Sequence, residues 1–297
     1  MARIREIKRR IGGVRTVQRI TRTMQMIATA KFTSAVQKVS SARPYSERID
    51  RLVGEALAAA GGEFEHPLVD GPSESPSRER VLVITSNRGM CGAYNANALR
   101  TAAAHIRALR ERGRELDLET AGKKAVGYFR FQKIPVTVSH AMGDEPRYDE
   151  IERLATTYIE DFTAGRHDAV HVVCMRYLST SRQEPRVIRL LPLAPPVASG
   201  AGAEPPAGGG ASALYDFSPS VQSILDQLMP VAVKTILFQA FLESNVSEQI
   251  MRMVAMKAAT ENAGDLVRTL TRRFNRARQT QITTELMEII SGAAALE

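Results

Sequence analysis

Both ends of the chain carry apolar residues at helical spacing over lengths that few folds can hold. From Met1 to about Gly61 they recur in steps of three or four, the spacing that lines one stripe of an α-helix. The stripe comprises Ile4, Ile7, Ile11, Val14, Val17, Ile20, Met24, Ile27 and Ala30. A helix of about 55 residues would be roughly 80 Å long. No small globule covers such a helix, so it needs a partner helix or another protein.

The spacing along this first stripe is not a clean seven-residue repeat. Three-residue steps around Val17 act as a stammer, which predicts that the packing seam drifts around the helix. After "ALAAA", Gly61 and Gly62 offer a C-terminal cap that would end the helix.

A second and longer helical pattern occupies the C-terminal end. It begins after an N-cap candidate at Ser218 to Ser220 and continues to Ala295, about 75 residues or about 110 Å of helix. Its apolar positions include Ile250, Met253, Leu266, Leu270, Phe274, Ala277, Ile282, Leu286 and Ile289. Pro230 predicts a kink or a restart early in the pattern. Two such helices most simply pair with each other, antiparallel if both leave one side of the middle region, and the longer one then extends beyond its mate.

Between the two helices the pattern changes to alternating strands and helices. Strand candidates are "RVLVITS" (80–86), "ELDLETA" (115–121), "PVTVSH" (135–140), "DAVHVVCM" (168–175) and "PRVIRLLPL" (185–193), separated by helical stretches at 93–113, 123–132 and 150–164. This alternation predicts an α/β fold with a parallel sheet of about five strands. A Pro-, Gly- and Ala-rich linker follows. The expected domains are therefore 1–61, 62–193, the linker at 194–213, and 214–297.

Composition agrees with long helices and points to an anionic partner. Aromatic residues make up 5% of the chain and there is no Trp, whereas hydrophobic residues reach 44%. The net charge is +8 and the pI is about 9.7, which favours an acidic or phosphate-bearing partner. Cys91 and Cys174 are far apart, so we expect reduced core thiols. No apolar run approaches 18 residues and the N-terminus lacks an apolar core segment, so we expect neither a membrane span nor a secretory signal.

One short stretch resembles a phosphate-binding turn. "VLVITSNRGMCGAYNAN" joins a strand to a helix through glycines, a geometry that can hold phosphate on helix amides. It matches neither common nucleotide-binding motif, so a structural turn that needs Gly89 and Gly92 for its backbone is the stronger interpretation. The five histidines form no metal-binding pair. We expect neither catalysis nor a cofactor.

Charge is distributed unevenly along the chain. Residues 7–46 contain no Asp or Glu but nine bases: Lys8, Arg9, Arg10, Arg15, Arg19, Arg22, Lys31, Lys38 and Arg43. A second group, Arg268, Arg272, Arg273, Arg276 and Arg278, lies near the C-terminus. A charge run is usually a solvated face, and nucleic acid remains an alternative although no groove-reading motif is present. The helix lacks the bulky face of a membrane-binding helix, so an acidic protein surface fits best.

Several long motifs stand out: "REIKRRIGGVRTVQRITRTMQMIATAK" with "ARPYSE", "VLVITSNRGMCGAYNAN", "MVAMKAATENAGDLV" and "RFNRARQTQITTELMEIISGAAAL". Together they resemble one known family, the gamma subunit of F-type ATP synthase. The resemblance covers nearly the whole chain. The central turn departs from the family pattern at Asn87, Met90 and Ala93. "MPVAVKTILFQAFLES" lacks the expected charges, and the 194–213 loop is longer than a tight connection.

The resemblance implies a central rotor shaft. It predicts an antiparallel coiled coil threaded through a ring of catalytic and non-catalytic subunits, with a Rossmann-like domain beside it, near an epsilon-type subunit and a membrane ring that carries ions. The complex would lie on the cytoplasmic side of a bacterial plasma membrane and couple ion flow to ATP synthesis or hydrolysis.

By position, the resemblance also assigns contact residues. Those expected to contact the catalytic subunits are Met24, Arg252, Arg278, Gln279, Thr283 and Glu285. Those expected to form the tip in an apolar bearing are Gly292, Ala293, Ala294, Ala295 and Leu296. Those expected to seat on the ion-carrying ring are Arg43, Tyr45 and Asp216. An acidic loop of the catalytic subunits would then lie against the acid-free helix.

Overall fold

A computed structural model describes residues 2–59, 66–70, 77–193 and 221–294. Its elements are α1 (Ala2–Ala59), α2 (Pro67–Asp70), β1 (Arg78–Ile84), α3 (Tyr94–Glu111), β2 (Glu115–Ala121), α4 (Lys123–Phe131), β3 (Val138–His140), α5 (Tyr148–Thr163), β4 (Ala169–Tyr177), β5 (Gln183–Leu191) and α6 (Val221–Ala294). The expected cap at Gly61–Gly62, the linker 194–213 and the N-cap at Ser218–Ser220 lie outside the described residues. The chain forms two compact units: residues 1–31, 90–92 and 250–297, and residues 32–89 and 93–249.

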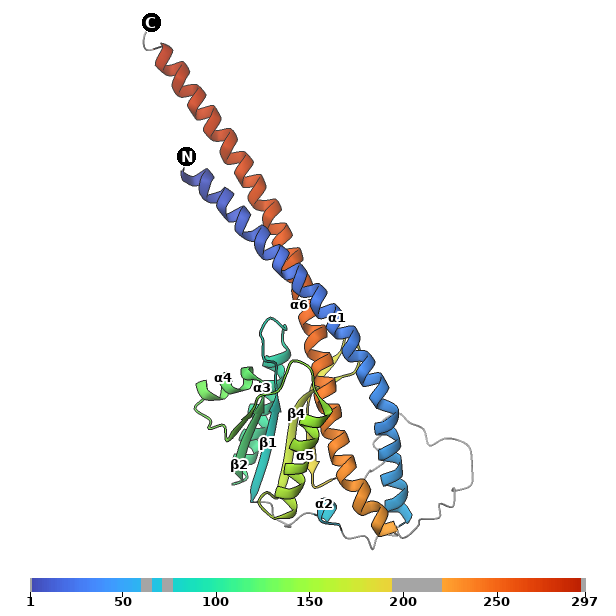
Figure 1. Cartoon of the computed structure of the whole chain (residues 1–297). Helices are drawn as coiled ribbons and strands as arrows, with labels where there is room; N and C mark the ends of the chain where they lie inside the picture. The colour runs from blue at the N-terminus through green and yellow to red at the C-terminus, as the bar shows by residue number, and fades with distance from the viewer. Residues whose placement is uncertain (1, 60–65, 71–76, 194–220, 295–297) are drawn as a thin grey trace. The chain divides into compact units, whose positions relative to one another are not determined.

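The second unit is built on a five-stranded sheet in the order β3-β2-β1-β4-β5. Strands β2, β1 and β4 are labelled in Figure 1. Strand β1 pairs in parallel with β2 and β4, and β2 pairs in parallel with β3. The predicted α/β sheet is confirmed, but the parallel direction is wrong for β5, which runs antiparallel to β4. Only residues 178–182 separate these two strands, and a parallel return needs a crossover of about a dozen residues.

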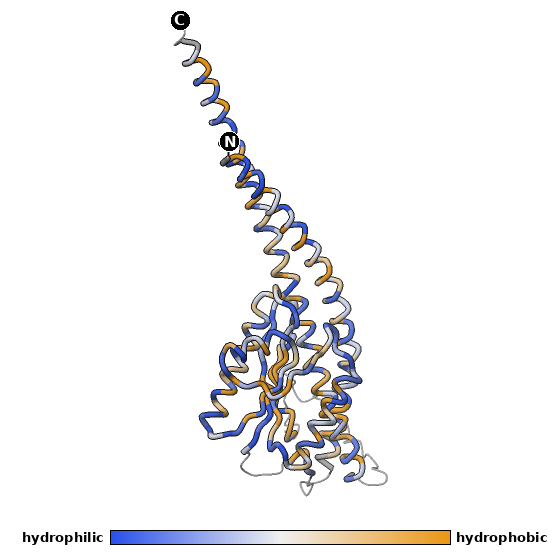
Figure 2. Tube along the Cα trace, turned by 60° about the vertical axis from the view of Figure 1, so that its left-hand side comes forward, coloured by the Kyte–Doolittle hydropathy of each residue, from blue (hydrophilic) through white to orange (hydrophobic). Residues whose placement is uncertain are grey.

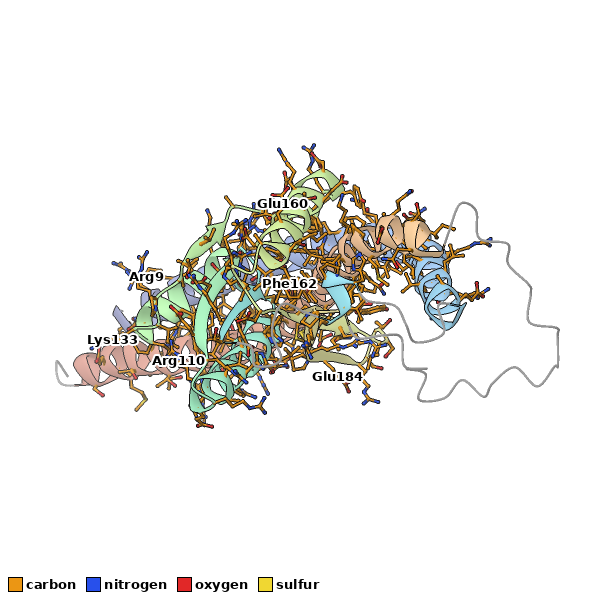
Figure 3. All side chains as sticks on the ribbon, turned by 90° about the horizontal axis from the view of Figure 1, so that it is seen from below. Arg9, Arg110, Lys133, Glu160, Phe162 and Glu184 are labelled. Atoms are coloured by element: carbon orange, nitrogen blue, oxygen red, sulfur yellow. The ribbon has the colours of Figure 1, made fainter. Side chains whose placement is uncertain are left out.

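Helices cover both faces of the sheet, as the alternation of its side chains requires. Val81 and Val83 of β1 face a cluster with α3 and α4. Leu82 and Ile84 face the other cluster, which contains residues of α5, the later part of α1 and the first part of α6. On α5, Phe162 points toward the sheet and is buried, whereas Glu160 lies on the outside (Figure 3). The continuous apolar run of β1 therefore supplies side chains to both cores, because successive residues of a strand point to opposite faces of the sheet.

The first part of α6 is a core helix of the second unit. Leu225, Met229 and Val233 are at most 1% exposed within the cluster on the α5 face. The predicted restart at Pro230 is wrong, because α6 continues through this residue, and burial of the residues around it stabilises the helix despite one lost hydrogen bond. By length and composition alone α6 could also cross a membrane, contrary to our expectation, but 44% of its most apolar window is buried in the protein.

The buried seam of α1 follows a strict seven-residue repeat. Ile11, Thr21, Ala28, Ala35, Ser46, Ile49, Val53 and Ala56 are all under 9% exposed, and each falls on one of two positions of a single heptad. The predicted drift is therefore wrong. Polar Gln18 and Thr21 occupy the seam while apolar Val17 and Ile20 lie beside it, more than half exposed. The predicted apolar stripe matches the seam at Ile4, Ile7, Ile11 and Val14, and it leaves the seam from Val17 onward.

In the first unit, α1 and α6 pair antiparallel, as predicted. Gln18 Nε2 donates to Thr260 O over 3.5 Å, and Thr260 Oγ1 lies 2.8 Å from Thr21 Oγ1. Nearer the N-terminus, Ile4 and Ile7 share a groove with Leu270 and Ala277, so numbering falls on one helix as it rises on the other. Beyond this groove Ile282, Leu286, Met287, Ile289 and Ile290 are 52–72% exposed. Polar and apolar residues alternate along both helices (Figure 2).

Gly122 provides a direct test of the β2–α4 turn. Its φ is +108°, and a Cβ there would lie 2.1 Å from Thr85 O. We expect Gly122→Ala to lower the free energy of unfolding by at least about 2 kcal/mol, because a clash adds to backbone strain. Gly127→Ala is the control, since nothing lies within 4 Å of its Cβ position and it sits inside α4. It should be neutral or stabilising by up to about 1 kcal/mol in urea unfolding of the full chain.

Neighbouring substitutions test the position of the α1 seam. Ala28 is 1% exposed and Ile27 is 52% exposed. We expect Ala28→Lys to lower the thermal unfolding midpoint of the helical signal at 222 nm by several degrees, because it buries a charge in the seam. Ile27→Lys should leave the midpoint nearly unchanged. Equal losses would support a drifting seam instead.

Candidate functional site: an interaction surface on the paired helices

The turn between β1 and α3 is held by its own side chains. Asn95 Oδ1 accepts a hydrogen bond of 3.0 Å from Ser86 N, and Ser86 Oγ donates to Arg88 O over 2.6 Å. Gly92 has a φ of +58°, which favours glycine. A Cβ on Gly89 would make only ordinary contact, 3.7 Å from Lys124 Cε. The turn therefore needs Gly92 for its backbone shape, whereas the surroundings of Gly89 would admit a side chain.

The crevice at the carboxyl ends of β1 and β2 has no room for a nucleotide. Its cavity measures about 40 Å³ and is lined by Thr85, Gly122, Phe241, Ser244 and Asn245 among others, whereas ligand pockets are typically about 300–1,000 Å³. The chain's own helix α6 thus fills the place where open α/β sheets bind ligands.

The first amides of α4, which could otherwise hold an anion, already donate within the protein. Lys124 N donates to Ser86 O over 3.2 Å, and Ala125 N donates to Thr85 Oγ1 over 3.0 Å. Lys123 N donates to Asn87 Oδ1 over 3.3 Å. This helix start therefore offers no vacant phosphate cradle.

The histidines in the sheet and directly before β4 have structural partners. His140, His167 and His171 lie 2.7, 2.6 and 2.9 Å from carboxylate oxygens of Glu119, Asp117 and Glu79 respectively. Burial, with the nearby charge of Arg189, lowers the pKa of His171 to about 4, so this ring is neutral at pH 7. Among the residues that the structure describes, no group of three or more His, Cys, Asp or Glu side chains could hold a metal.

Cys91 and Cys174 are both buried and neither forms a disulfide, as predicted. Burial raises the pKa of Cys174 to about 12, which keeps this thiol protonated and unreactive.

The most unusual surface of the first unit is an apolar stripe on α1 among unbalanced bases. Val17, Ile20 and Ile27 are 52–54% exposed, and Met24, on the same stripe, is half-buried. Arg15, Arg19 and Arg22 are exposed on the same turns. Farther along, where acidic partners exist, Lys38 Nζ lies 2.8 Å from Glu145. We name the set Val17, Ile20, Met24, Ile27, Arg15, Arg19 and Arg22 the α1 stripe.

A groove between α1 and α6 adds a second basic surface. It encloses about 670 Å³ and is open to solvent. Its apolar lining is Ile4, Ile7, Leu270 and Ala277, and Arg10, Arg273 and Arg276 outnumber a single acid, Glu6. Apolar floors bordered by cations suit amphipathic acidic protein segments better than a bare polyanion.

The structure separates the residues that the resemblance grouped as contacts. Met24 lies on the α1 stripe, about 30 Å along the helix from Ile4. Arg278, Gln279, Thr283 and Glu285 are exposed on α6, and Arg278 and Glu285 line a small pocket with Ile4 and Arg5. Arg252 differs, because it is only 9% exposed. Sequence reasoning missed the exposure of Val17, Ile20 and Ile27. The sequence feature that could have predicted this exposure is the set of polar residues Gln18, Thr21 and Gln25, which are spaced three and four apart as seam residues are.

The remaining predicted site residues are only partly described. Tyr45 is 56% exposed, and Arg43 Nε lies 2.8 Å from Glu47 Oε1 on the same helix. Gly292 is exposed near the end of α6, and Ala293 and Ala294 complete that helix. Ala295, Leu296 and Asp216 lie outside the described residues.

Taken together, these features define an α/β protein with long paired terminal helices that carry exposed apolar and basic surfaces. Comparisons with known proteins agree. The family model described as ATP synthase matches residues 3–296. The chain is 41% identical over 300 residues to the ATP synthase gamma chain of Rhodopirellula baltica, covering 100% of both. It is 37% identical over 298 residues to that of Pelotomaculum thermopropionicum, again covering 100% of both.

Solved structures share the fold. A chain of the Euglena gracilis mitochondrial ATP synthase (OSCP/F1/c-ring, rotational state 3) superposes with a TM-score of 0.62 at 18% identity, over 99% of this chain and 95% of that one. A chain of the Tetrahymena thermophila mitochondrial ATP synthase central stalk and c-ring gives 0.57 at 17% identity, over 81% and 99%. From the family match and its full-length relatives, this chain belongs to the ATP synthase gamma chain family.

The filled crevice generates a prediction about nucleotides. Isolated full-length protein titrated with millimolar ATP in a calorimeter should show no saturable binding heat, since a cavity of about 40 Å³ cannot take the ligand. The matched control is Phe241→Ala, which enlarges the cavity and should still bind nothing if the turn is only structural. Saturable heat in the unaltered protein would contradict this interpretation.

Proposed function

We propose that this chain is the rotating central stalk of an F-type ATP synthase. It would couple ion flow through a membrane ring to ATP synthesis or hydrolysis in a surrounding ring of catalytic and non-catalytic subunits. The observation that carries the proposal is the α1 stripe: exposed apolar residues and unbalanced arginines on a helix whose other side is already paired. Such a surface needs a neighbour, and its charge fits an acidic protein.

The mechanism is differential contact. A shaft with different residues on each side meets each catalytic subunit differently at each angle, so rotation changes the relative free energies of the open and closed states of each site. Contacts must be individually weak for the shaft to turn. Exposed ion pairs supply about 0–1 kcal/mol each and are screened over roughly 10 Å at 0.1 M salt. Many dispersed arginines therefore give attraction without one deep minimum.

The contact residues retain the roles that the resemblance suggests. Met24 would face an acidic loop of a catalytic subunit, and the exposed Arg278, Gln279, Thr283 and Glu285 would contact the same ring farther along. Arg252, being mostly buried, would contribute least to direct contact. Gly292 to Leu296 would turn in an apolar bearing. Arg43, Tyr45 and Asp216 would seat on the ion-carrying ring beside an epsilon-type subunit.

The chain itself would perform no chemistry. The filled crevice and the structural histidines support a non-catalytic role, with ATP handled by other subunits. The complex would lie on the cytoplasmic side of a bacterial plasma membrane, where this chain is held peripherally. The alternative, a nucleic-acid-binding protein, draws support only from net charge, and the apolar side chains of the α1 stripe weigh against it.

Met24→Lys tests the contact assigned to the α1 stripe. A lysine there adds a flexible cation opposite the proposed acidic loop and creates an attraction that hinders rotation. We expect the variant to assemble and to hydrolyse ATP, but to pump fewer ions per ATP in membrane vesicles. The defect should shrink at high salt, because screening weakens the added pair.

Met24→Leu is the matched control for that experiment, because it changes shape but not charge. Its pumping per ATP should stay near that of the unaltered complex. Equal coupling in the two variants at low salt would rule out an acidic partner at this position. Failure of the unaltered chain to purify with a catalytic ring would overturn the proposed function itself.

A further inference from the structure

A second acid-free stretch lies in the sheet-containing unit. From Thr120 to Gly143 the chain has no Asp or Glu, but it carries Lys123, Lys124, Arg130 and Lys133. This stretch includes α4 and β3, which ends the sheet on one side. All four bases are exposed, and Lys133 is among the labelled side chains at the periphery in Figure 3. None of these four bases belongs to the α1 stripe.

Apolar side chains are exposed at the same place. Phe131, the last residue of α4, is 83% exposed, the highest value among the large hydrophobic residues that the structure describes. Val138 of β3 is 41% exposed. Beside them a groove of about 580 Å³ is lined by Val126, Arg130, Lys133, Ile134, Pro135, Val136, Thr137 and Ser139. Its lining contains two cations and no acid.

A simpler explanation is that this edge is only protected from aggregation. Short edge strands and lysines are common means of preventing unwanted strand pairing, and β3 has three residues. That explanation accounts for Lys133 but not for the apolar side chains at this edge. Protection predicts polar side chains along the edge, whereas Phe131 is exposed and Val126, Ile134, Pro135 and Val136 form the groove. An apolar groove bordered by cations is a typical docking surface for a protein segment.

We propose that the α4–β3 edge of the sheet binds an acidic, extended segment of another protein subunit of the assembled complex. The segment would lie in the groove beside β3, with apolar side chains against Val126, Ile134 and Val136. Its carboxylates would approach Arg130 and Lys133. Its backbone can add to the outer side of β3, the usual manner in which an extended peptide joins a sheet edge. The partner's acidity follows from charge complementarity.

The surface chemistry favours a protein segment over other polyanions. Nucleic acid binding draws mainly on many phosphate contacts, and only two cations line this groove. A lipid surface would favour a broad apolar face of a helix. On α4 the buried side, with Ala125 and Phe129, already packs on the sheet. A cross-link to nucleic acid and a cross-link to lipid are therefore separate outcomes of the experiment below.

Photo-cross-linking in the intact complex tests the proposal. p-Benzoyl-phenylalanine replaces Phe131, which preserves an aromatic ring, and the purified complex is illuminated and digested for mass spectrometry. We expect one dominant cross-linked product that joins position 131 to an acidic segment of another subunit. Products confined to lipid, nucleic acid or this chain, or no product at all, would overturn the proposal.

Charge reversal supplies the specificity control. Combined with the photoreactive residue, Arg130→Glu with Lys133→Glu should reduce the cross-link yield about fivefold or more, since two weak attractions become repulsions. Arg107→Glu with Arg110→Glu makes the same change in net charge on exposed residues of α3 and should alter the yield less than about twofold. Equal losses in both variants would contradict a site at this edge.

The inference rests on the proposed function only in assuming that the chain belongs to a multisubunit complex. The proposed function and the proposed docking surface are refuted by different results. If the chain does not purify with a catalytic ring, the proposed function fails. If the complex purifies and pumps normally but position 131 cross-links to no acidic segment, only the docking surface at the α4–β3 edge fails.

Discussion

The structure depends on burying one side of α6 against the sheet. Isolated helices gain little from their own hydrogen bonds, and tertiary packing supplies most of their stability. Leu225, Met229, Val233 and Leu237 provide that packing, since each is at most 1% exposed in the same cluster as Ile84 and Val172. With this section of α6 held, the helix can continue through Pro230 and on to the residues that pair with α1. A single helix thus serves as core in one unit and as half of a coiled coil in the other.

The coiled coil is closely packed but not strongly apolar. Its seam on α1 includes Ala28 and Thr21, and a threonine hydroxyl contact replaces a leucine layer. Small and polar seam residues let two helices approach closely, and they leave larger apolar side chains such as Val17 and Ile27 on the outer surface. For a protein that has to contact changing neighbours this arrangement has a clear use. The seam between the two helices supplies the free energy of pairing, and the outer surface is left for many weak contacts with other proteins.

The sheet shows how a fold can persist without the ligand that such folds often bind. Its order, β3-β2-β1-β4-β5, creates a crevice at the strand ends where nucleotides bind in many α/β proteins. Here α6 occupies that place, and Gly122 lets the β2–α4 turn approach Thr85 too closely for any side chain. Fold and function therefore have to be argued separately. In this chain the surfaces that we propose to be functional lie on helices and at a sheet edge.

The sequence alone determined the element types, the α/β alternation, the two long helices and the excess of positive charge, because these follow from local periodicity and composition. It also carried the family resemblance, through motifs such as "MVAMKAATENAGDLV". Three features were decided only by tertiary structure. The antiparallel direction of β5 depends on its pairing with β4. The α1 seam depends on which side chains α6 presents, so polar Thr21 is buried against Thr260 while apolar Ile20 is exposed. The α4–β3 edge becomes a groove only when the turn after α4 brings Ile134 and Val136 beside Val126. The α1 seam depends on contacts between residues far apart in the sequence, and local patterns contain no information about those partners. The other two features depend on how neighbouring segments turn back on one another, which the periodicity of each segment does not show.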